Sequence, residues 1–70
     1  MTKLPQVSHE RVIRALERRG FQVLRQGKHV AMTDGQSIVI VPRQPTIKPG
    51  TLRQILEAAG LTVEEFRDLL

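Results

Sequence analysis

The sequence predicts an α+β domain: a three-stranded antiparallel sheet with two main helices on one face and a short helix at the C-terminal end. Apolar residues recur at helical spacing near both ends of the chain. Three shorter runs of strand-like alternation lie between these segments, and the connections that join them are short. Because consecutive elements with short connections usually lie side by side, we expect the strands to form a meander.

The size of the chain limits what it can build. Its 70 residues predict a single domain over residues 1–70. A chain of this length buries roughly 60% of its unfolded surface, so its core is thin. A hydrophobic content of 40% is typical of a globular protein. No apolar run has the length of a membrane span or a signal sequence, which favours a cytoplasmic protein without a membrane partner.

The first helix is predicted to begin after Ser8, a good N-cap residue, and to end at Gly20. Val7 and Val12 stand on either side of the cap, at the positions of a hydrophobic staple. The apolar face consists of Val12, Ile13, Ala15 and Leu16. The opposite side carries Arg11, Arg14 and Arg18. We interpret this arginine stripe as a solvated face in preference to a phosphate-binding one.

Three strands are expected over residues 21–25, 28–33 and 36–41. The dipeptide Asp34-Gly35 between the second and third runs favours a two-residue type I′ hairpin. Pro42 should stop the third strand, because proline has no N–H to donate to a ladder. The expected register places Thr33 opposite Gln36, Val30 opposite Val39, and His29 opposite Ile40.

Period-two alternation then defines the two faces of the sheet. One face is expected to carry Val30, Met32, Val39 and Val41. The other is expected to carry His29, Ala31, Thr33, Gln36, Ile38 and Ile40. We expect the helices to cover the valine and methionine face, which leaves the His29 face partly exposed, apolar and cationic, as a partner-binding surface would be. The alternative is that a loop or a terminal helix covers Ile38 and Ile40.

The last third of the chain predicts two helices. Pro49 suits the first turn of the longer one, which should end at Gly60. Its apolar face consists of Leu52, Ile55, Leu56 and Ala59. Thr62 and Glu65 form a capping box for a short helix, with Leu61 and Phe66 as its staple. The whole order resembles the double-stranded RNA-binding domain, although a fold alone does not give function.

Charge and composition narrow the classes of function. The net charge is +4, and between Arg18 and Leu56 seven bases accompany a single acid, Asp34. Such a local excess favours nucleic acid or an acidic protein as partner, with a solubilising surface as the alternative. Only two aromatic residues are present, which argues against a module that stacks single-stranded bases. With no cysteine and two histidines, we expect no disulfide, metal site or cofactor.

His29 is the one residue in the central hairpin with an obvious capacity for proton transfer at neutral pH. It follows Gly27 and Lys28 and opens a strand that can hold it still. A lone histidine near a turn is usually no more than an exposed polar residue. His9, at the start of the first helix, is expected to be an ordinary surface residue.

An ordered set of motifs resembles the HicA toxin family over essentially the whole chain. The set comprises Gly20-Phe21, Arg25 to His29, Asp34-Gly35, Val41-Pro42-Arg43, Pro49 to Arg53, Ile55-Leu56, Ala59-Gly60-Leu61 and Glu64-Glu65-Phe66. The resemblance implies a small ribonuclease of a toxin–antitoxin system, an mRNA interferase, whose active-site histidine falls on His29. It also implies a HicB-type antitoxin that covers the His29 face. Lys28 replaces the family's serine before the histidine, and Gln44 stands where many members have a second histidine.

The leading hypothesis is therefore a metal-independent endoribonuclease in which His29 is the general acid or base. Arg25, Lys28 and Arg43 are candidates to stabilise charge on the phosphate, because the predicted fold places them near His29. Lys48 and Arg53 are further candidates for RNA contact. The second proton-transfer group is left open: a water, a lysine, or His29 of a second subunit. A homodimer or a hetero-oligomer with the antitoxin is compatible with the sequence.

Two other functions remain open at this point. One is a non-catalytic RNA-binding module of the same fold, which would bind RNA without cleaving it. The other is a partner-binding domain that uses only the apolar surface around Ile38 and Ile40. Salt-dependent RNA binding would favour the RNA-binding module over the partner-binding domain. RNA cleavage in EDTA would favour the enzyme over both.

Overall fold

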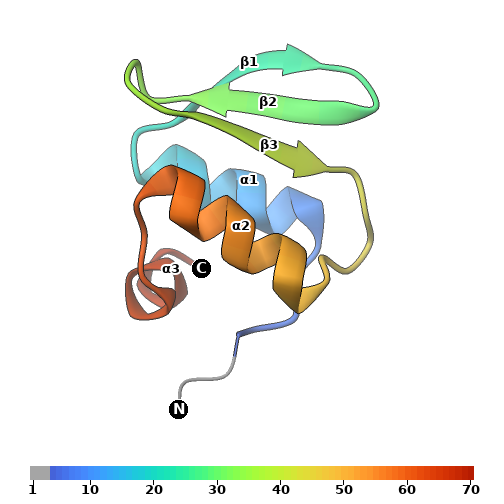
Figure 1. Cartoon of the computed structure of the whole chain (residues 1–70), viewed down its shortest axis with the longest axis vertical. Helices are drawn as coiled ribbons and strands as arrows, with labels where there is room; N and C mark the ends of the chain where they lie inside the picture. Colours follow the sequence, from blue (N-terminus) through green and yellow to red (C-terminus); the bar gives the residue numbers. More distant parts are fainter. Residues whose placement is uncertain (1–3) are drawn as a thin grey trace.

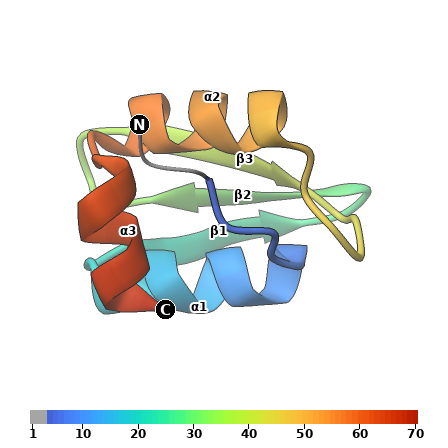
Figure 2. The same cartoon turned by 90° about the horizontal axis from the view of Figure 1, so that it is seen from below.

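The computed structural model, which describes residues 4–70, has the predicted architecture (Figure 1). Three antiparallel strands form one sheet in the order β1-β2-β3, and α1 and α2 lie on one face of it. Viewed from the helix side, α3 crosses one end of this helix layer (Figure 2). The elements are α1 (His9–Arg18), β1 (Gln22–Gln26), β2 (His29–Thr33), β3 (Ile38–Pro42), α2 (Pro49–Ala59) and α3 (Val63–Leu69).

Local capping residues set the ends of the helices, as predicted. The Ser8 hydroxyl accepts a hydrogen bond from the backbone N–H of Arg11 at the start of α1. Gly60 ends α2 with φ of 72°, a left-handed conformation that glycine adopts without steric cost. Thr62 and Glu65 form the expected capping box: the backbone N–H of each donates to the side chain of the other, over 2.9 and 3.1 Å.

The hairpin between β2 and β3 differs from the prediction. Its connection comprises the four residues 34–37, so Thr33 pairs with Ile38 instead of Gln36. The expected type I′ turn was wrong because the Asp34 carboxylate accepts the backbone N–H groups of Gln36 and Ser37, over 2.9 and 2.7 Å. These bonds hold a longer loop closed. In the observed register Val30 pairs with Val41, Ala31 with Ile40, and His29 with Pro42.

The register between β2 and β3 is shifted by two residues, so every side chain of these two strands keeps the face predicted for it. The core-facing side chains of β2 and β3 are at most 2% exposed, and they are Val30, Met32, Val39 and Val41. They pack with Leu16 of α1, Leu52 of α2 and Phe66 of α3. On the other face Ile38 and Ile40 are 61% and 51% exposed. The alternative in which a loop or helix covers these two isoleucines is therefore wrong.

Candidate functional site

A groove on the uncovered face of the sheet brings together three of the residues predicted to act on RNA. Its volume is about 480 Å³. It is lined by Arg25, Gly27, Lys28, His29, Ala31 and Ile40. These residues come from the end of β1, the turn that follows it, β2 and the facing part of β3. The groove thus lies at the end of the sheet where β1 turns into β2 (Figure 1).

The backbone holds His29 in a fixed place at the edge of this groove. His29 is the first residue of β2 and pairs with Pro42 of β3. Its carbonyl oxygen accepts a hydrogen bond from the backbone N–H of Gly27, 3.1 Å away, which closes the β1–β2 turn. The residue is exposed, and within the described chain its imidazole makes no hydrogen bond. The ring is therefore available to a ligand.

A β-bulge brings Arg25 to the same face as His29. Regular alternation along β1 would place Arg25 on the side of Phe21 and Val23, toward the core. The structure instead pairs Val23 with Met32 and Arg25 with Ala31, which leaves Leu24 as the extra residue. Leu24 is 60% exposed, and Arg25 shares the face of Ala31. The sequence contains no glycine or proline at this position that would have indicated the bulge.

The groove carries positive charge and little side-chain bulk. Arg25 and Lys28 contribute two cations, and no acid lines it. At Gly27 an added Cβ would meet nothing within 4 Å, and the φ angle of Gly27 lies outside the left-handed region. The absent side chain at Gly27 therefore leaves this part of the groove open. A phosphate group would find opposite charge and room here.

Three other predicted cations do not line the groove. Arg43 follows Pro42, the strand partner of His29, so it lies at the same end of the sheet. Lys48 is the N-cap residue of α2, and Arg53 is exposed on that helix. Both therefore belong to the helix layer. The structure therefore groups Arg25 and Lys28 with His29, and it separates Lys48 and Arg53 from that group.

His9 has a structural place that the sequence did not indicate. It is half-buried, and its Nδ1 lies 3.0 Å from the carbonyl oxygen of Gln44. The same carbonyl accepts the backbone N–H of His9, also over 3.0 Å. These two contacts tie the start of α1 to the loop between β3 and α2. His9 does not line the groove, and neither does Gln44.

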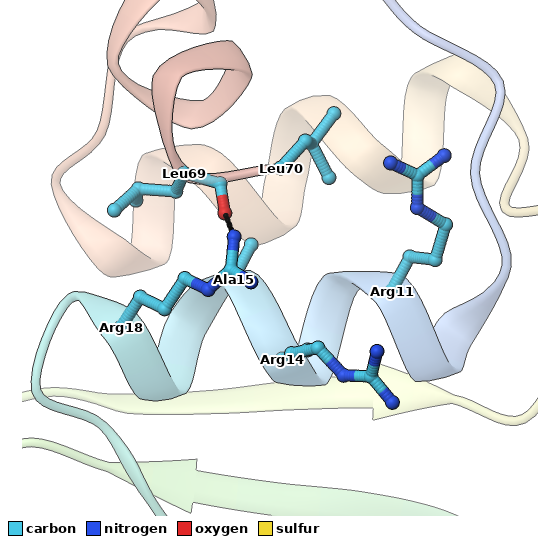
Figure 3. Close-up of a pocket in the computed structure, with 6 residues that line it drawn as sticks. All are labelled: Arg11, Arg14, Ala15, Arg18, Leu69 and Leu70. Carbon is cyan, nitrogen blue, oxygen red and sulfur yellow. Dashed lines mark hydrogen bonds between the residues drawn. The ribbon is translucent and has the colours of Figure 1, made fainter.

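A second, smaller hollow of about 100 Å³ lies between α1 and the end of the chain (Figure 3). Its lining consists of Arg11, Arg14, Ala15, Arg18, Leu69 and Leu70. The Arg18 guanidinium donates a hydrogen bond of 2.7 Å to the Leu69 carbonyl oxygen, so part of the arginine stripe contacts the C-terminal residues. Figure 3 shows the three guanidinium groups spread along the helix rather than converging on one point. The hollow is therefore a weaker candidate for ligand binding than the groove at His29.

Residues 4–70 contain neither a cluster of metal-binding side chains nor a helix that could cross a membrane. No three histidine, cysteine, aspartate or glutamate side chains gather there as ligands for a metal ion. Over the same residues, no helix combines the length and the apolar character that crossing a bilayer requires.

Comparison with known protein families finds a match over most of the chain. The sequence model of a family described as HicA toxin of bacterial toxin-antitoxin matches residues 10–61. The matched segment runs from the first turn of α1 to just past α2 and includes the whole sheet. It contains every residue that lines the groove at His29. Comparison with curated proteins finds no relative that matches the chain.

Proposed function

Because this chain belongs to the HicA toxin family of bacterial toxin–antitoxin systems, we propose that it is an endoribonuclease that cleaves mRNA by proton transfer at His29. Family membership makes the chain the toxin of such a system. The observation that supports His29 is its position: an exposed imidazole, fixed at the start of a strand, beside two cations. Because its target is mRNA, the toxin acts in the cytoplasm.

RNA carries its own nucleophile, so the reaction needs few protein groups. A neutral imidazole accepts the proton of a ribose 2′-OH, and the 2′ oxygen attacks the adjacent phosphorus. The bond from phosphorus to the 5′ oxygen of the next nucleotide breaks, and that oxygen takes a proton from an acid. The products are a 2′,3′-cyclic phosphate and a free 5′-OH end. The groove offers one imidazole, so water, Lys28 or His29 of a second subunit supplies the other proton-transfer group.

The proposed role of the cations in the groove is to stabilise negative charge, not to transfer protons. Negative charge grows on the non-bridging phosphate oxygens in the transition state, and fixed donors close to them lower the barrier. Arg25 and Lys28 line the groove with His29, so they are the first candidates for this role. Arg43 follows the neighbouring strand end and extends the positive surface. Lys48 and Arg53 belong to the helix layer, at the N-cap of α2 and on α2, and their proposed role is contact with phosphates farther along the RNA.

The proposed chemistry is tested with two RNA oligonucleotides that differ at one sugar. The wild-type chain should cleave the all-ribose oligonucleotide in EDTA and leave a cyclic phosphate end. The same oligonucleotide with a 2′-deoxy sugar at the cleavage position should bind equally and stay intact. Cleavage of both would contradict attack by the 2′ oxygen. Binding without cleavage of either would identify the chain as an RNA-binding module that has no catalytic activity.

We also propose that the antitoxin partner, of HicB type, covers the face that carries His29. This face exposes three large apolar side chains, those of Leu24, Ile38 and Ile40. Apolar groups close to cations are typical of a surface that binds another protein. A partner seated there would keep RNA away from the groove. Added antitoxin should therefore stop cleavage and RNA binding together.

A further inference from the structure

The two edges of the sheet are protected very differently. The β1 edge carries the bulge at Leu24 and the charge of Arg25, both of which discourage another strand from pairing with it. The β3 edge is the segment Ile38–Pro42, which has no charge and pairs regularly with β2 at all five residues. Proteins usually blunt a free edge with a charge or a bulge. On β3 only the terminal Pro42 serves this purpose.

The outer edge of β3 retains unused hydrogen-bonding groups. In the sheet β3 has one neighbour, β2. Within residues 4–70 the backbone of β3 makes no hydrogen bond outside that ladder. In an antiparallel edge strand about half of the N–H and C=O groups point away from the neighbour. A second extended backbone is the ligand that satisfies such a row of alternating donors and acceptors.

A groove runs beside this edge, between β3 and α2. Its volume is about 240 Å³. Residues 38–40 of the strand line one side of it, and Thr51, Gln54, Ile55 and Ala58 of α2 line the other. None of these side chains is charged. RNA is a poor occupant, because the groove offers no cation to a phosphate.

We propose that the antitoxin partner adds an extended segment to the free edge of β3 and seats it in this groove. The inference rests on the toxin–antitoxin pairing that family membership implies, and it adds the mode of contact. The segment should be uncharged where it crosses the groove, with alternate apolar side chains beside Ile38 and Ile40. Acidic residues should flank it near Arg43 and Lys48. A second copy of this chain fits less well, because each copy has a net charge of +4.

Amide hydrogen exchange tests the proposed edge contact directly. The probe is the HicB-type antitoxin that pairs with this toxin, purified as a complex with the ¹⁵N-labelled toxin. The outward amides of β3 should exchange at least about tenfold more slowly in the complex than in the free chain, because new hydrogen bonds protect them. The amides of β1 that point away from β2 should keep their rates. Unchanged exchange along β3 in a stable complex would overturn the proposal.

A matched pair of substitutions tests the groove. Gln54→Arg places a long cation in it, whereas Gln22→Arg makes the same exchange at an exposed position on the opposite edge strand. We expect Gln54→Arg to weaken antitoxin binding at least about tenfold and Gln22→Arg to leave it unchanged. Equal losses in the two variants, or none, would overturn the proposal. Both variants should retain the RNA cleavage of the wild type, since neither residue lines the groove at His29.

The same measurements separate this inference from the proposed enzymatic function. If the free wild-type chain fails to cleave RNA, the proposed ribonuclease activity is wrong. Amide exchange along β3 in the complex would still test the edge contact. If the toxin cleaves RNA and binds its antitoxin but the β3 amides are not protected, the proposed ribonuclease activity stands. The proposed edge contact is then wrong.

Discussion

Truncation of Leu56 to alanine should remove a large part of the stability of this domain. The Leu56 side chain projects from α2 into the core and is 3% exposed. A buried leucine-to-alanine change costs about 2–5 kcal/mol, because apolar burial is lost and a cavity remains. At roughly 0.05–0.15 kcal/mol per residue, a domain of 70 residues has about 4–10 kcal/mol in all. The variant should therefore lose about half of its free energy of unfolding.

Leu24→Ala is the matched control, because it removes the same atoms from a side chain that is 60% exposed. Surface changes of this kind usually alter stability by no more than about 0.5 kcal/mol. Urea unfolding followed by far-UV circular dichroism measures both variants, with the midpoints compared at equal slopes. A Leu56→Ala midpoint equal to that of the wild type, or equal losses in the two variants, would refute the assignment of α2 to the core.

Three further predictions concern the turn and the groove. The backbone N–H groups of Ser37 and Gln36 hold the pKa of the Asp34 carboxyl below its usual range, so its contribution to stability is complete above about pH 4 and is lost as the pH falls through the lowered value. Urea midpoints at pH 7 and pH 3 should accordingly differ less in Asp34→Asn than in the wild type, and an equal difference would contradict this. Gly27→Val should leave the free energy of unfolding in urea within about 0.5 kcal/mol of the wild type yet reduce RNA cleavage, because the added side chain enters the groove; unimpaired cleavage would place RNA elsewhere. Arg25→Ala and Lys28→Ala should each reduce the dependence of RNA binding on salt concentration by about 0.7 in the log–log slope, measured by fluorescence anisotropy; unchanged slopes would remove both from the phosphate contacts.

Much of the fold follows from local chemistry that the sequence displays directly. Ser8, Gly60 and the Thr62–Glu65 pair mark helix ends because capping depends on residues within one turn. The faces of β2 and β3 follow from alternation alone. The predicted faces are therefore correct even though the predicted register was wrong by two residues.

The features that the sequence did not indicate depend on competing or distant contacts. The Asp34 carboxylate competes for the N–H groups of its own loop, which lengthens the hairpin connection. The bulge at Leu24 depends on how β1 docks against β2, and it carries Arg25 to the open face. His9 contacts the carbonyl oxygen of Gln44, a residue 35 positions away in the sequence. The Asp34 case is a competition between two local structures, whereas the bulge and the place of His9 depend on residues distant in the sequence.

The candidate site shows the same division. Gly27, Lys28 and His29 are consecutive in the chain, so the turn between β1 and β2 presents them together. Lys48 and Arg53 share the basic segment but lie on α2, in the other layer of the fold. A count of charges along the sequence could not separate them from Arg25 and Lys28, because that separation arises from the packing of α2 beneath the sheet.

RNA cleavage by His29→Ala is the most direct test of the function proposed for this chain. The ring is exposed and makes no hydrogen bond or ion pair within the described chain, so the variant should keep its circular dichroism spectrum and urea midpoint. Its RNA affinity should stay within about threefold of the wild type, since the cations remain. Cleavage in EDTA should fall by at least about a hundredfold, the usual contribution of a general acid or base. Undiminished cleavage by the folded variant would contradict catalysis by His29.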